Sequence, residues 1–371
     1  MTTSHPKIAV DAMGGDFAPR SVVEGALEAA AGGISVVLVG DRQRIQREIK
    51  RQGAPLDRVD IEHADQVVAM EERPAAVRQK RQSSVRVCAR LVKEGAAQAM
   101  VTAGNTGAAM IAAKTVIGSI PGVDRPALAG VFPNKRGRTV VLDVGANVDA
   151  RAAHLRQFAV MGHFYAQEIV GTKAPRIGLM SVGEEEGKGT DLTREVFHVL
   201  QETGLNFVGN VEGRDVFTGS VDVIVCDGFV GNVLLKTSES VAEFVGGLMK
   251  RELVANWRTR LGYWLARPAF EAFRRRTDWS EFGAAPLLGV RAGCFIGHGR
   301  SNAKAMHNAI LGAWEFVATD LHNKIRGKVA ELHERESALL GTGKAAAAIE
   351  TPSADASTTD ASSIEPPEDS R

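Results

Sequence analysis

A lysine between two glycines is the residue of this sequence best suited to hold an anion. Lys188 lies between Gly187 and Gly189 in the segment EEEGKGTDLTRE (184–195). Because neither neighbour carries a side chain, the ammonium group can reach a phosphate as a point charge, and Thr190 stands where a helix would begin. The alternative is a surface lysine neutralised by the preceding glutamates. The spacing of a Walker A loop is absent, which gives little support to nucleoside triphosphate binding.

A second candidate group ends the segment CDGFVGN (226–232). The amide of Asn232 could orient an acyl carbonyl or the attacking oxygen. Asp227 and Gly231 are candidate substrate contacts in the same segment, although capping of the next helix is the leading alternative for Asp227. Cys226 ends an alternating strand pattern, which favours a small buried side chain over a nucleophile.

The segment GHGRSN (297–302) places a histidine and an arginine between glycines. His298 can donate or relay a proton near neutral pH, and Arg300 can bind a phosphate with two hydrogen bonds. The alternative is a turn in which Ser301 or Asn302 caps the following helix. We therefore take His298 as a candidate catalytic group and the other three as candidate substrate contacts.

Two further glycine-rich loops carry polar side chains. Asp11 and Asp16 flank the glycines of DAMGGD and could hold a metal, but two acids are weak evidence and the same residues form turns well. In GNTG (104–107), Asn105 and Thr106 could donate to phosphate or cap a helix. The candidate substrate contacts in these loops and in DVGANVD (143–149) are Gly14, Gly15, Asn105, Thr106, Gly107 and Asn147.

The elements that must position these loops are six short runs of β-branched and aliphatic residues. Each run leads directly into a glycine-rich loop, and most are followed by a helical pattern. This order is typical of a doubly wound, mainly parallel α/β sheet, in which ligands bind beyond the carboxyl ends of the strands. We therefore predict that the loops share one edge of the sheet and form a site for phosphate or a phosphorylated substrate. The runs are 8–10, 99–101, 139–142, 177–180, 221–225 and 294–296.

The chain of 371 residues is predicted to form one α/β domain over residues 1–335. Within it, the stretch 237–283 has a helical pattern without strands and is rich in arginine and tryptophan. The tail 336–371 is rich in Ala, Ser, Thr, Pro and acids, and is predicted to be disordered. Other predicted elements are a strand at 34–39 and helices at 21–32, 41–53, 83–95, 151–169, 190–203 and 301–335.

Composition excludes several classes of protein. A formal charge of +1 gives no chain-wide attraction to nucleic acid. Three scattered cysteines without a C-x-x-C pair fit a reducing cytoplasm, and neither a secretory leader nor a transmembrane run is evident. The motifs HExxH, GxSxG and GxGxxG are absent. We therefore expect no metal or cofactor, and an enzyme that positions two substrates and stabilises charge.

Taken in order, these motifs resemble the bacterial phosphate acyltransferases of phospholipid synthesis over about residues 7–320. The resemblance implies transfer of a long-chain acyl group from acyl carrier protein to inorganic phosphate, giving acyl phosphate for the acylation of glycerol 3-phosphate. It also implies a dimer with a fold similar to isocitrate and isopropylmalate dehydrogenases and to phosphotransacetylase. The motifs are IAVDAMGGDFAP (8–19), RQKRQSS (78–84), VTAGNTGA (101–108), DVGANVD (143–149), EEGKGTDL (185–192), CDGFVGN (226–232) and FIGHGRSN (295–302).

The resemblance gives Lys188, Asn232 and His298 the catalytic positions, for phosphate binding and oxyanion support. Arg300 departs from the family pattern, in which a small residue is more common. Phosphate can attack a thioester directly, which agrees with the lack of a protein nucleophile. The main alternative is a short-chain phosphotransacylase that uses acyl-coenzyme A.

The basic and aromatic stretch at about 250–280 has three candidate roles: contact with anionic lipid, docking of acidic acyl carrier protein, or a dimer interface. With such a product, we expect a cytoplasmic protein bound peripherally to the membrane, with a glycerol-3-phosphate acyltransferase as a further candidate partner. The residues concerned are Trp257, Arg258, Arg260, Tyr263, Trp264, Arg267, Phe270, Phe273 and Arg274 to Arg276.

Overall fold

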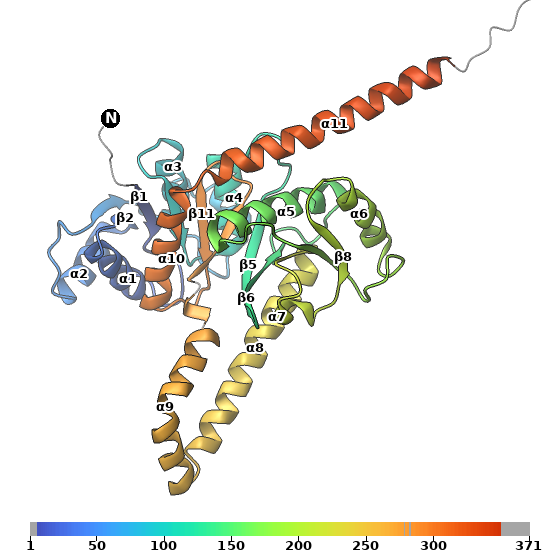
Figure 1. The fold of residues 1–371 in the computed structure, drawn as a ribbon. Coiled ribbons are helices and arrows are strands. Elements are labelled where there is room, and N and C mark those ends of the chain that lie inside the picture. The colour runs from blue at the N-terminus through green and yellow to red at the C-terminus, as the bar shows by residue number, and fades with distance from the viewer. Residues whose placement is uncertain (1–5, 278, 282, 350–371) are drawn as a thin grey trace, which may run out of the picture. The chain divides into compact units, whose positions relative to one another are not determined.

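The computed structural model of the chain describes residues 6–277, 279–281 and 283–349 (Figure 1). The chain divides into two compact units, Met1–Ala330 and Glu331–Arg371. All strands in the described part of the chain and all candidate site residues belong to the first unit.

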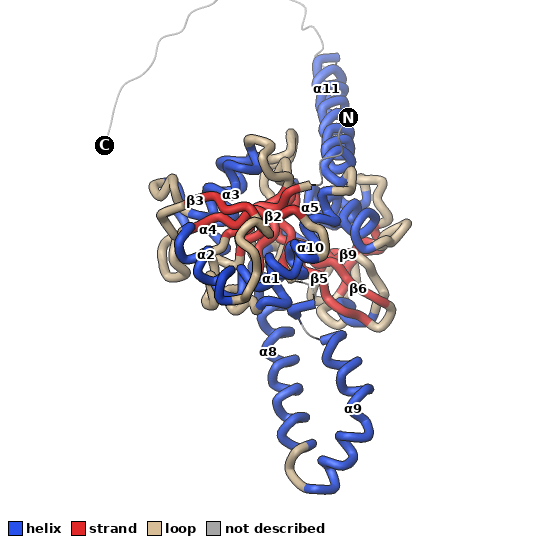
Figure 2. The backbone as a smooth tube through the Cα atoms, turned by 90° about the vertical axis from the view of Figure 1, so that its left-hand side faces the viewer, coloured by secondary structure: helices blue, strands red, loops and turns tan. Residues whose placement is uncertain are grey.

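Eleven strands in the described part of the chain form a single sheet, drawn in red in Figure 2. The strands are β1 (Lys7–Asp11), β2 (Ser35–Gly40), β3 (Asp60–His63), β4 (Ala99–Thr102), β5 (Ala127–Asn134), β6 (Gly137–Leu142), β7 (Ile177–Met180), β8 (Phe207–Val211), β9 (Val223–Val225), β10 (Ala284–Leu288) and β11 (Gly293–Gly297). Their order across the sheet is β3-β2-β1-β4-β11-β10-β5-β6-β9-β7-β8.

The predicted mainly parallel α/β sheet is confirmed, and each of the six hydrophobic runs is a strand. The prediction that their loops share one edge is wrong. β10 is antiparallel to both β11 and β5, and β5 is antiparallel to β6. The parallel group containing β1, β4 and β11 therefore runs opposite to the group containing β6, β9 and β7. A strand–loop–helix pattern reads the same in either direction, so sequence could not reveal this reversal.

The helices cover both faces of the sheet (Figure 1). The α-helices are α1 (Arg20–Ala31), α2 (Arg42–Arg51), α3 (Ser84–Lys93), α4 (Thr106–Ala112), α5 (Ala152–Tyr165), α6 (Asp191–Gln201), α7 (Asp215–Thr218), α8 (Gly228–Leu253), α9 (Trp257–Thr277), α10 (Ala303–Val317) and α11 (Leu321–Ile349). Short 3-10 or π segments are η1 (Pro74–Arg78), η2 (Ala113–Ile117), η3 (Ala166–Val170) and η4 (Trp279–Glu281). The single helix predicted over 301–335 is divided into α10 and α11.

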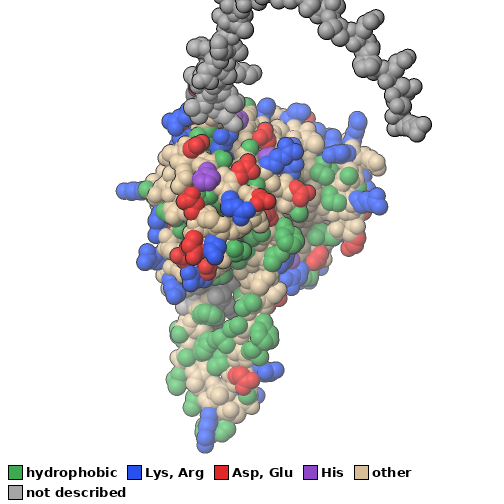
Figure 3. All heavy atoms as spheres, turned by 90° about the vertical axis from the view of Figure 1, so that its right-hand side faces the viewer, with side chains coloured by type: hydrophobic (Ala, Val, Ile, Leu, Met, Phe, Trp, Pro, Cys, Tyr) green, Lys and Arg blue, Asp and Glu red, His purple; other side chains and the backbone are tan. Residues whose placement is uncertain are grey.

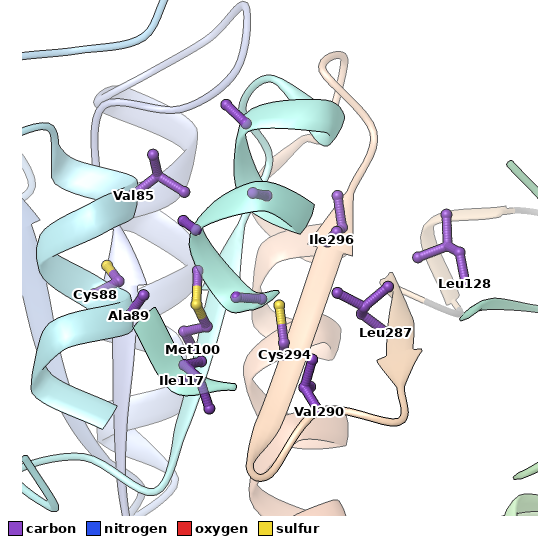
Figure 4. Close-up of a cluster of buried hydrophobic side chains, with 14 of the residues drawn as sticks. Val85, Cys88, Ala89, Met100, Ile117, Leu128, Leu287, Val290, Cys294 and Ile296 are labelled. Atoms are coloured by element: carbon purple, nitrogen blue, oxygen red, sulfur yellow. The ribbon is translucent and has the colours of Figure 1, made fainter. Parts of the chain in front are cut away.

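Burial on both faces explains why the strands are almost uninterrupted hydrophobic runs. On one face, Met100 of β4 and Cys294 of β11 pack in a cluster with Cys88 of α3 (Figure 4). On the other face, the ring of Phe295 meets that of Phe316 in α10 edge to face, with centroids 5.4 Å apart. Successive residues of β11 therefore pack against different helical layers, as the alternation of side chains along a strand requires.

The stretch 237–283 is helical as far as Thr277, but its first helix begins earlier than predicted, at Gly228. Consequently Asn232 lies on a helix rather than in a loop. α8 and α9 form a helical pair that extends away from the sheet (Figures 1 and 2). The pair exposes large apolar side chains, including Phe244 and Trp264 (Figure 3). None of the described helices is long and apolar enough to cross a membrane.

The C-terminal helix differs from the sequence expectation. α11 continues to Ile349, so residues 336–349, for which we predicted disorder, are helical in the structure. The alanine-rich run KAAAAI explains the difference, because alanine has the highest helix propensity of all residues. The rest of the predicted disordered tail, 350–371, lies outside the described residues.

Candidate active site

The side chain of His298 meets a lysine that the sequence patterns did not single out. The Nζ atom of Lys236 in α8 lies 3.2 Å from Nε2 of His298. Lys236 also forms an ion pair with Glu239, one turn further along the helix, at 3.2 Å. α8 follows β9 and His298 follows β11, so this contact joins a helix and a loop that follow strands of the two oppositely directed groups.

The proton on His298 is determined by its neighbours. The backbone N–H of Arg300 donates to Nδ1 at 3.2 Å, which assigns the proton of a neutral ring to Nε2. Burial lowers the pKa of His298, and the nearby cation of Lys236 lowers it further. Arg300 acts in the same direction, while Glu239 and Asp16 raise the pKa. A neutral imidazole at pH 7 follows, with its N–H directed toward the ammonium group of Lys236.

Arg300 and Ser301 have different surroundings from those predicted. The guanidinium of Arg300 forms an exposed ion pair with Glu243 of α8, with N and O atoms 3.1 Å apart. Ser301 is only 4% exposed, and among the described residues its hydroxyl has no hydrogen-bond partner. The protein thus already supplies a carboxylate to Arg300, and packing encloses Ser301.

Four predicted substrate contacts cap helices. The side-chain oxygens of Asn105, Thr190, Asp227 and Asn302 accept a backbone N–H three residues further on, at distances of 3.0, 3.2, 2.9 and 2.9 Å. These bonds satisfy N–H groups that the first turn of a helix leaves without partners. The capping alternative is therefore the one that the structure displays at all four positions.

Asn105 has a further structural role. Its amide nitrogen lies 2.9–3.2 Å from the carbonyl oxygens of Ala69, Met70 and Glu72 and donates to them. Both ends of the amide are therefore held by protein, which argues against the predicted contact of this side chain with substrate. Its neighbour Thr106 is exposed at the start of α4.

The loops after β1, β4 and β11 approach one another through their main chains. A Cβ atom on Gly14 would lie 2.7 Å from the nitrogen of Gly104, so only glycine allows this approach. The backbone N–H of Asp16 donates to the carbonyl oxygen of Gly299 at 2.8 Å. Gly15 has a φ of +103°, a conformation that glycine adopts readily. These glycines therefore bring three loops together around His298. The predicted contact Gly107 packs in the same way against Pro74, which a Cβ atom would meet at 2.6 Å.

Asp11 organises this first set of loops. Its carboxylate is buried and accepts hydrogen bonds from the Thr102 hydroxyl at 2.8 Å and the Met13 N–H at 3.1 Å. Burial raises the pKa of Asp11, while these bonds oppose the increase. Among the described residues, no group of three or more His, Cys, Asp or Glu side chains is arranged to hold a metal ion.

Asp143 has the corresponding role at the end of β6. It is buried and accepts N–H groups from Leu128 at 2.9 Å, Ala146 at 3.0 Å and Asn147 at 2.5 Å. Burial raises the pKa of Asp143, again against its hydrogen bonds. Asn147 is 6% exposed and its amide donates to Asp143 and to a main-chain carbonyl. The prediction that the Asn147 side chain contacts substrate is therefore at odds with its burial.

The start of α8 packs tightly on this second set of loops. A Cβ atom on Gly231 would lie 1.9 Å from the carbonyl oxygen of Asp143. The role of this glycine is thus close packing of helix on loop. Asn232 is exposed and lies beside Gly145. A Cβ atom added to Gly145 would lie 3.5 Å from the Oδ1 atom of Asn232. Asn232 and Lys236 are one helical turn apart, so they share a face of α8.

Lys188 lies in the loop after β7. It is exposed, and its ammonium group makes no hydrogen bond or ion pair with any residue that the structure describes, Asn232 and His298 included. Two of the preceding glutamates have other partners: Glu184 pairs with Arg214 at 2.6 Å, and Glu186 lies 3.8 Å from a nitrogen of His198. The alternative that the glutamates neutralise Lys188 therefore gains no support.

The lysine loop is held by its main chain. The Ser181 hydroxyl donates to the carbonyl oxygen of Lys188 at 3.2 Å. Gly189 has a φ of +104°, and a Cβ atom there would lie 2.1 Å from the Thr193 hydroxyl. A Cβ atom on Gly187 would meet nothing within 4 Å. One glycine is thus required by the turn, and the other leaves open space beside the lysine.

All three cysteines are buried. Burial raises the pKa of the Cys88 and Cys226 thiols, and it raises that of Cys294 to about 12. The thiolate is the reactive form of cysteine, so none of the three is suited to act as a nucleophile. The interpretation of Cys226 as a small buried side chain is confirmed.

Solved structures define the class of fold. A phosphotransacetylase from Streptococcus pyogenes matches with a TM-score of 0.57 and 16% identity, and one from Staphylococcus aureus matches with a TM-score of 0.55 and 14% identity. Each match covers 84% of this chain and 94% of the other. At such low identity the likeness concerns the fold alone, which is therefore the α/β fold of the phosphotransacetylases.

Sequence comparison identifies the family within that class. The family model described as "Fatty acid synthesis protein" matches residues 6–324. Proteins named phosphate acyltransferase from Pelotomaculum thermopropionicum and Trichlorobacter lovleyi are 51% and 49% identical to this chain. Each alignment covers 88% of this chain, with 96% and 95% of the two relatives. The chain belongs to the phosphate acyltransferase family, and the resemblance seen in its motifs is confirmed.

Proposed function

We propose that the protein transfers a long-chain acyl group from acyl carrier protein to inorganic phosphate and releases acyl phosphate for phospholipid synthesis. The observation that carries this proposal is the contact between Lys236 and His298. The ring N–H and the ammonium group are both donors, and they face each other at 3.2 Å. An anionic oxygen bound beside the two nitrogens would accept from both, so the pair suits a phosphate.

The reaction needs no covalent intermediate on the protein. A phosphate oxygen attacks the carbonyl carbon of the thioester, the carbon–sulfur bond breaks, and the thiol leaves with a proton. A neutral His298 with its proton on Nε2 is suited to hold the attacking phosphate by donating a hydrogen bond to it, and the proton that phosphate loses leaves with the thiol. The amide of Asn232 is exposed on the same helix face as Lys236 and is suited to donate to the developing oxyanion.

Lys188 has the role of a second cation for phosphate in this proposal. It is exposed and two of its three glutamate neighbours are engaged elsewhere, which leaves its charge available to an incoming anion. Gly187 and Gly189 allow an anion to approach the main chain of the same loop. In this view the loop and the Lys236–His298 pair bind phosphate, while Asn232 supports the oxyanion that forms on the acyl group.

The decisive assay measures acyl phosphate formed from hexadecanoyl-acyl carrier protein, with and without phosphate. The Lys188→Ala variant is expected to raise the KM for phosphate by about 10–100-fold, because a hydrogen bond to a charged group contributes about 1.5–3 kcal/mol. Lys173→Ala is the matched control, since Lys173 is an exposed lysine on the segment before β7. An unchanged KM in the Lys188→Ala variant would remove this lysine from the site.

The same assay tests the alternative donor. Acyl-coenzyme A thioesters of short chain length are the substrates expected of a phosphotransacylase. If acetyl-coenzyme A proves the better substrate by kcat/KM, the proposed use of acyl carrier protein is wrong. A rate that does not depend on phosphate would contradict both enzymatic alternatives.

We further propose that the protein is a homodimer that binds peripherally to the cytoplasmic face of the membrane through the helical pair α8 and α9. The support is the exposure of Trp257 and Trp264, at 71% and 68%, beside arginines such as Arg258. The side chains of 274–276 lie outside the described residues. Light scattering tests whether the protein is a dimer, and flotation with anionic vesicles tests whether it binds membranes. If charge reversal of the three arginines at 274–276 left flotation unchanged, these arginines would have no role in membrane binding.

A further inference from the structure

A hollow runs along α8 from the Lys236–His298 contact. It has a volume of about 380 Å³ and is lined by Lys236, Thr237, Ser240, Val241 and Phe244. We call it the α8 hollow. Its two end residues are eight positions apart, which corresponds to about 12 Å along a helix.

The lining of the α8 hollow changes from polar to apolar with distance from His298. Lys236, Thr237 and Ser240 supply an ammonium group and two hydroxyls at the near end, and Val241 and Phe244 follow. The two apolar side chains are 53% and 66% exposed. A molecule with a polar head and an apolar tail would therefore find matching surfaces in the right order.

We propose that the α8 hollow binds the acyl chain of the thioester donor, with the carbonyl group next to Lys236 and His298 and the first methylenes over Val241 and Phe244. This inference rests on the proposed function and adds to it the place where the chain lies. The acyl group of the thioester has its only polar atom, the carbonyl oxygen, at one end, and the hollow has its only charged side chain at one end.

The chain would leave the hollow in a defined direction. Beyond Phe244, α8 continues with further exposed apolar side chains, among them Val245 at 41%. Exposed apolar surface on this scale is unusual unless a partner covers it. A long chain extending along α8 would cover the surface next to the hollow, whereas a short one would end inside it.

The experiment compares two aspartates introduced at adjacent positions of α8. Val241→Asp places a carboxylate in the apolar end of the hollow, and Ala242→Asp places the same group on an exposed position outside it. The kcat/KM is measured for hexadecanoyl- and butanoyl-acyl carrier protein. Each methylene kept from apolar contact changes affinity by up to about fourfold, so Val241→Asp should lower the hexadecanoyl-to-butanoyl ratio at least about tenfold. Ala242→Asp should change the ratio by less than about twofold.

A second variant fills the hollow rather than charging it. Ser240→Trp should also lower the ratio, because the indole occupies the space of the first methylenes. Equal hexadecanoyl-to-butanoyl ratios in the wild type, Val241→Asp and Ser240→Trp would overturn the inference. It would also be overturned if the variants lost kcat/KM equally with both donors and their mass measured by light scattering changed. That result would mark this face as an interface between two copies. If the wild type forms no acyl phosphate from either donor, the proposed function itself has failed.

Discussion

Replacement of Gly231 by alanine tests how the start of α8 is positioned. The added Cβ atom would lie 1.9 Å from the carbonyl oxygen of Asp143 and 3.1 Å from the sulfur of Cys226. The first contact is with the main chain, so no rotamer change can relieve it. Overpacking of this kind costs about 1–3 kcal/mol. Alanine gains about 1 kcal/mol over glycine within a helix, so we expect a net loss of up to about 2 kcal/mol in the free energy of unfolding.

The same helix contains its own control. A Cβ atom on Gly246 would meet nothing within 4 Å, and this glycine also lies within α8. Gly246→Ala should therefore gain the helix propensity without the contact, and raise the free energy of unfolding by about 1 kcal/mol. The two substitutions are chemically identical, but we expect opposite signs.

Urea denaturation of the full chain, followed by circular dichroism, measures both changes from the shift of the unfolding midpoint. The reasoning would be refuted if Gly231→Ala stabilised the protein as much as Gly246→Ala. Such a result would mean that α8 can move away from Asp143 at little cost. The kcat/KM of the Gly231→Ala variant adds a second readout, because a shift of the helix start would also move Asn232.

Two other predictions concern side chains of the site. Thr102→Val removes a hydroxyl that donates to Asp11 and accepts from the N–H of Gly104, and it should lower the free energy of unfolding by about 1–3 kcal/mol. Thr102→Ser should nearly retain wild-type stability, and equal denaturation midpoints for the two variants would contradict this. Burial lowers the pKa of His298 most, and the cation of Lys236 lowers it further. Lys236→Gln removes this cation and should raise the pKa, so the acidic limb of the kcat/KM profile should move to higher pH. Lys236→Arg keeps the charge and should leave that limb in place. If the limb did not move in Lys236→Gln, Lys236 would not influence the protonation of His298 during the reaction.

The strands that sequence revealed are those with continuous hydrophobic runs. β5 was missed because Gly130 and Pro133 interrupt its pattern, and both residues are poor in strands. β10 was missed for a similar reason, since Pro286 lies at its centre. These two strands produce the reversal of direction across the sheet, so the main topological error follows from them. Local patterns report burial, whereas strand direction depends on partners far away in the sequence.

The site was predicted in part for the same reason. The glycine-rich loops were found because glycine has a local signature, and His298 was found within one of them. Lys236 was missed because a lysine on a helix looks like any solvated lysine. Its signal was its position one turn after Asn232, which would place both side chains on one face. The helix caps were visible in the sequence, but only the structure shows that Asn105 uses its whole amide within the protein.

The burial of Cys88, Cys226 and Cys294 has a practical consequence. Maleimides and haloacetamides require an accessible thiolate, so the native protein should react very slowly with them. A single cysteine introduced at an exposed position of α8 would then carry a fluorophore or spin label without removal of the natural thiols. Such a probe would follow binding of the acyl donor along α8 in real time. Labelling of the three native cysteines would then report unfolding.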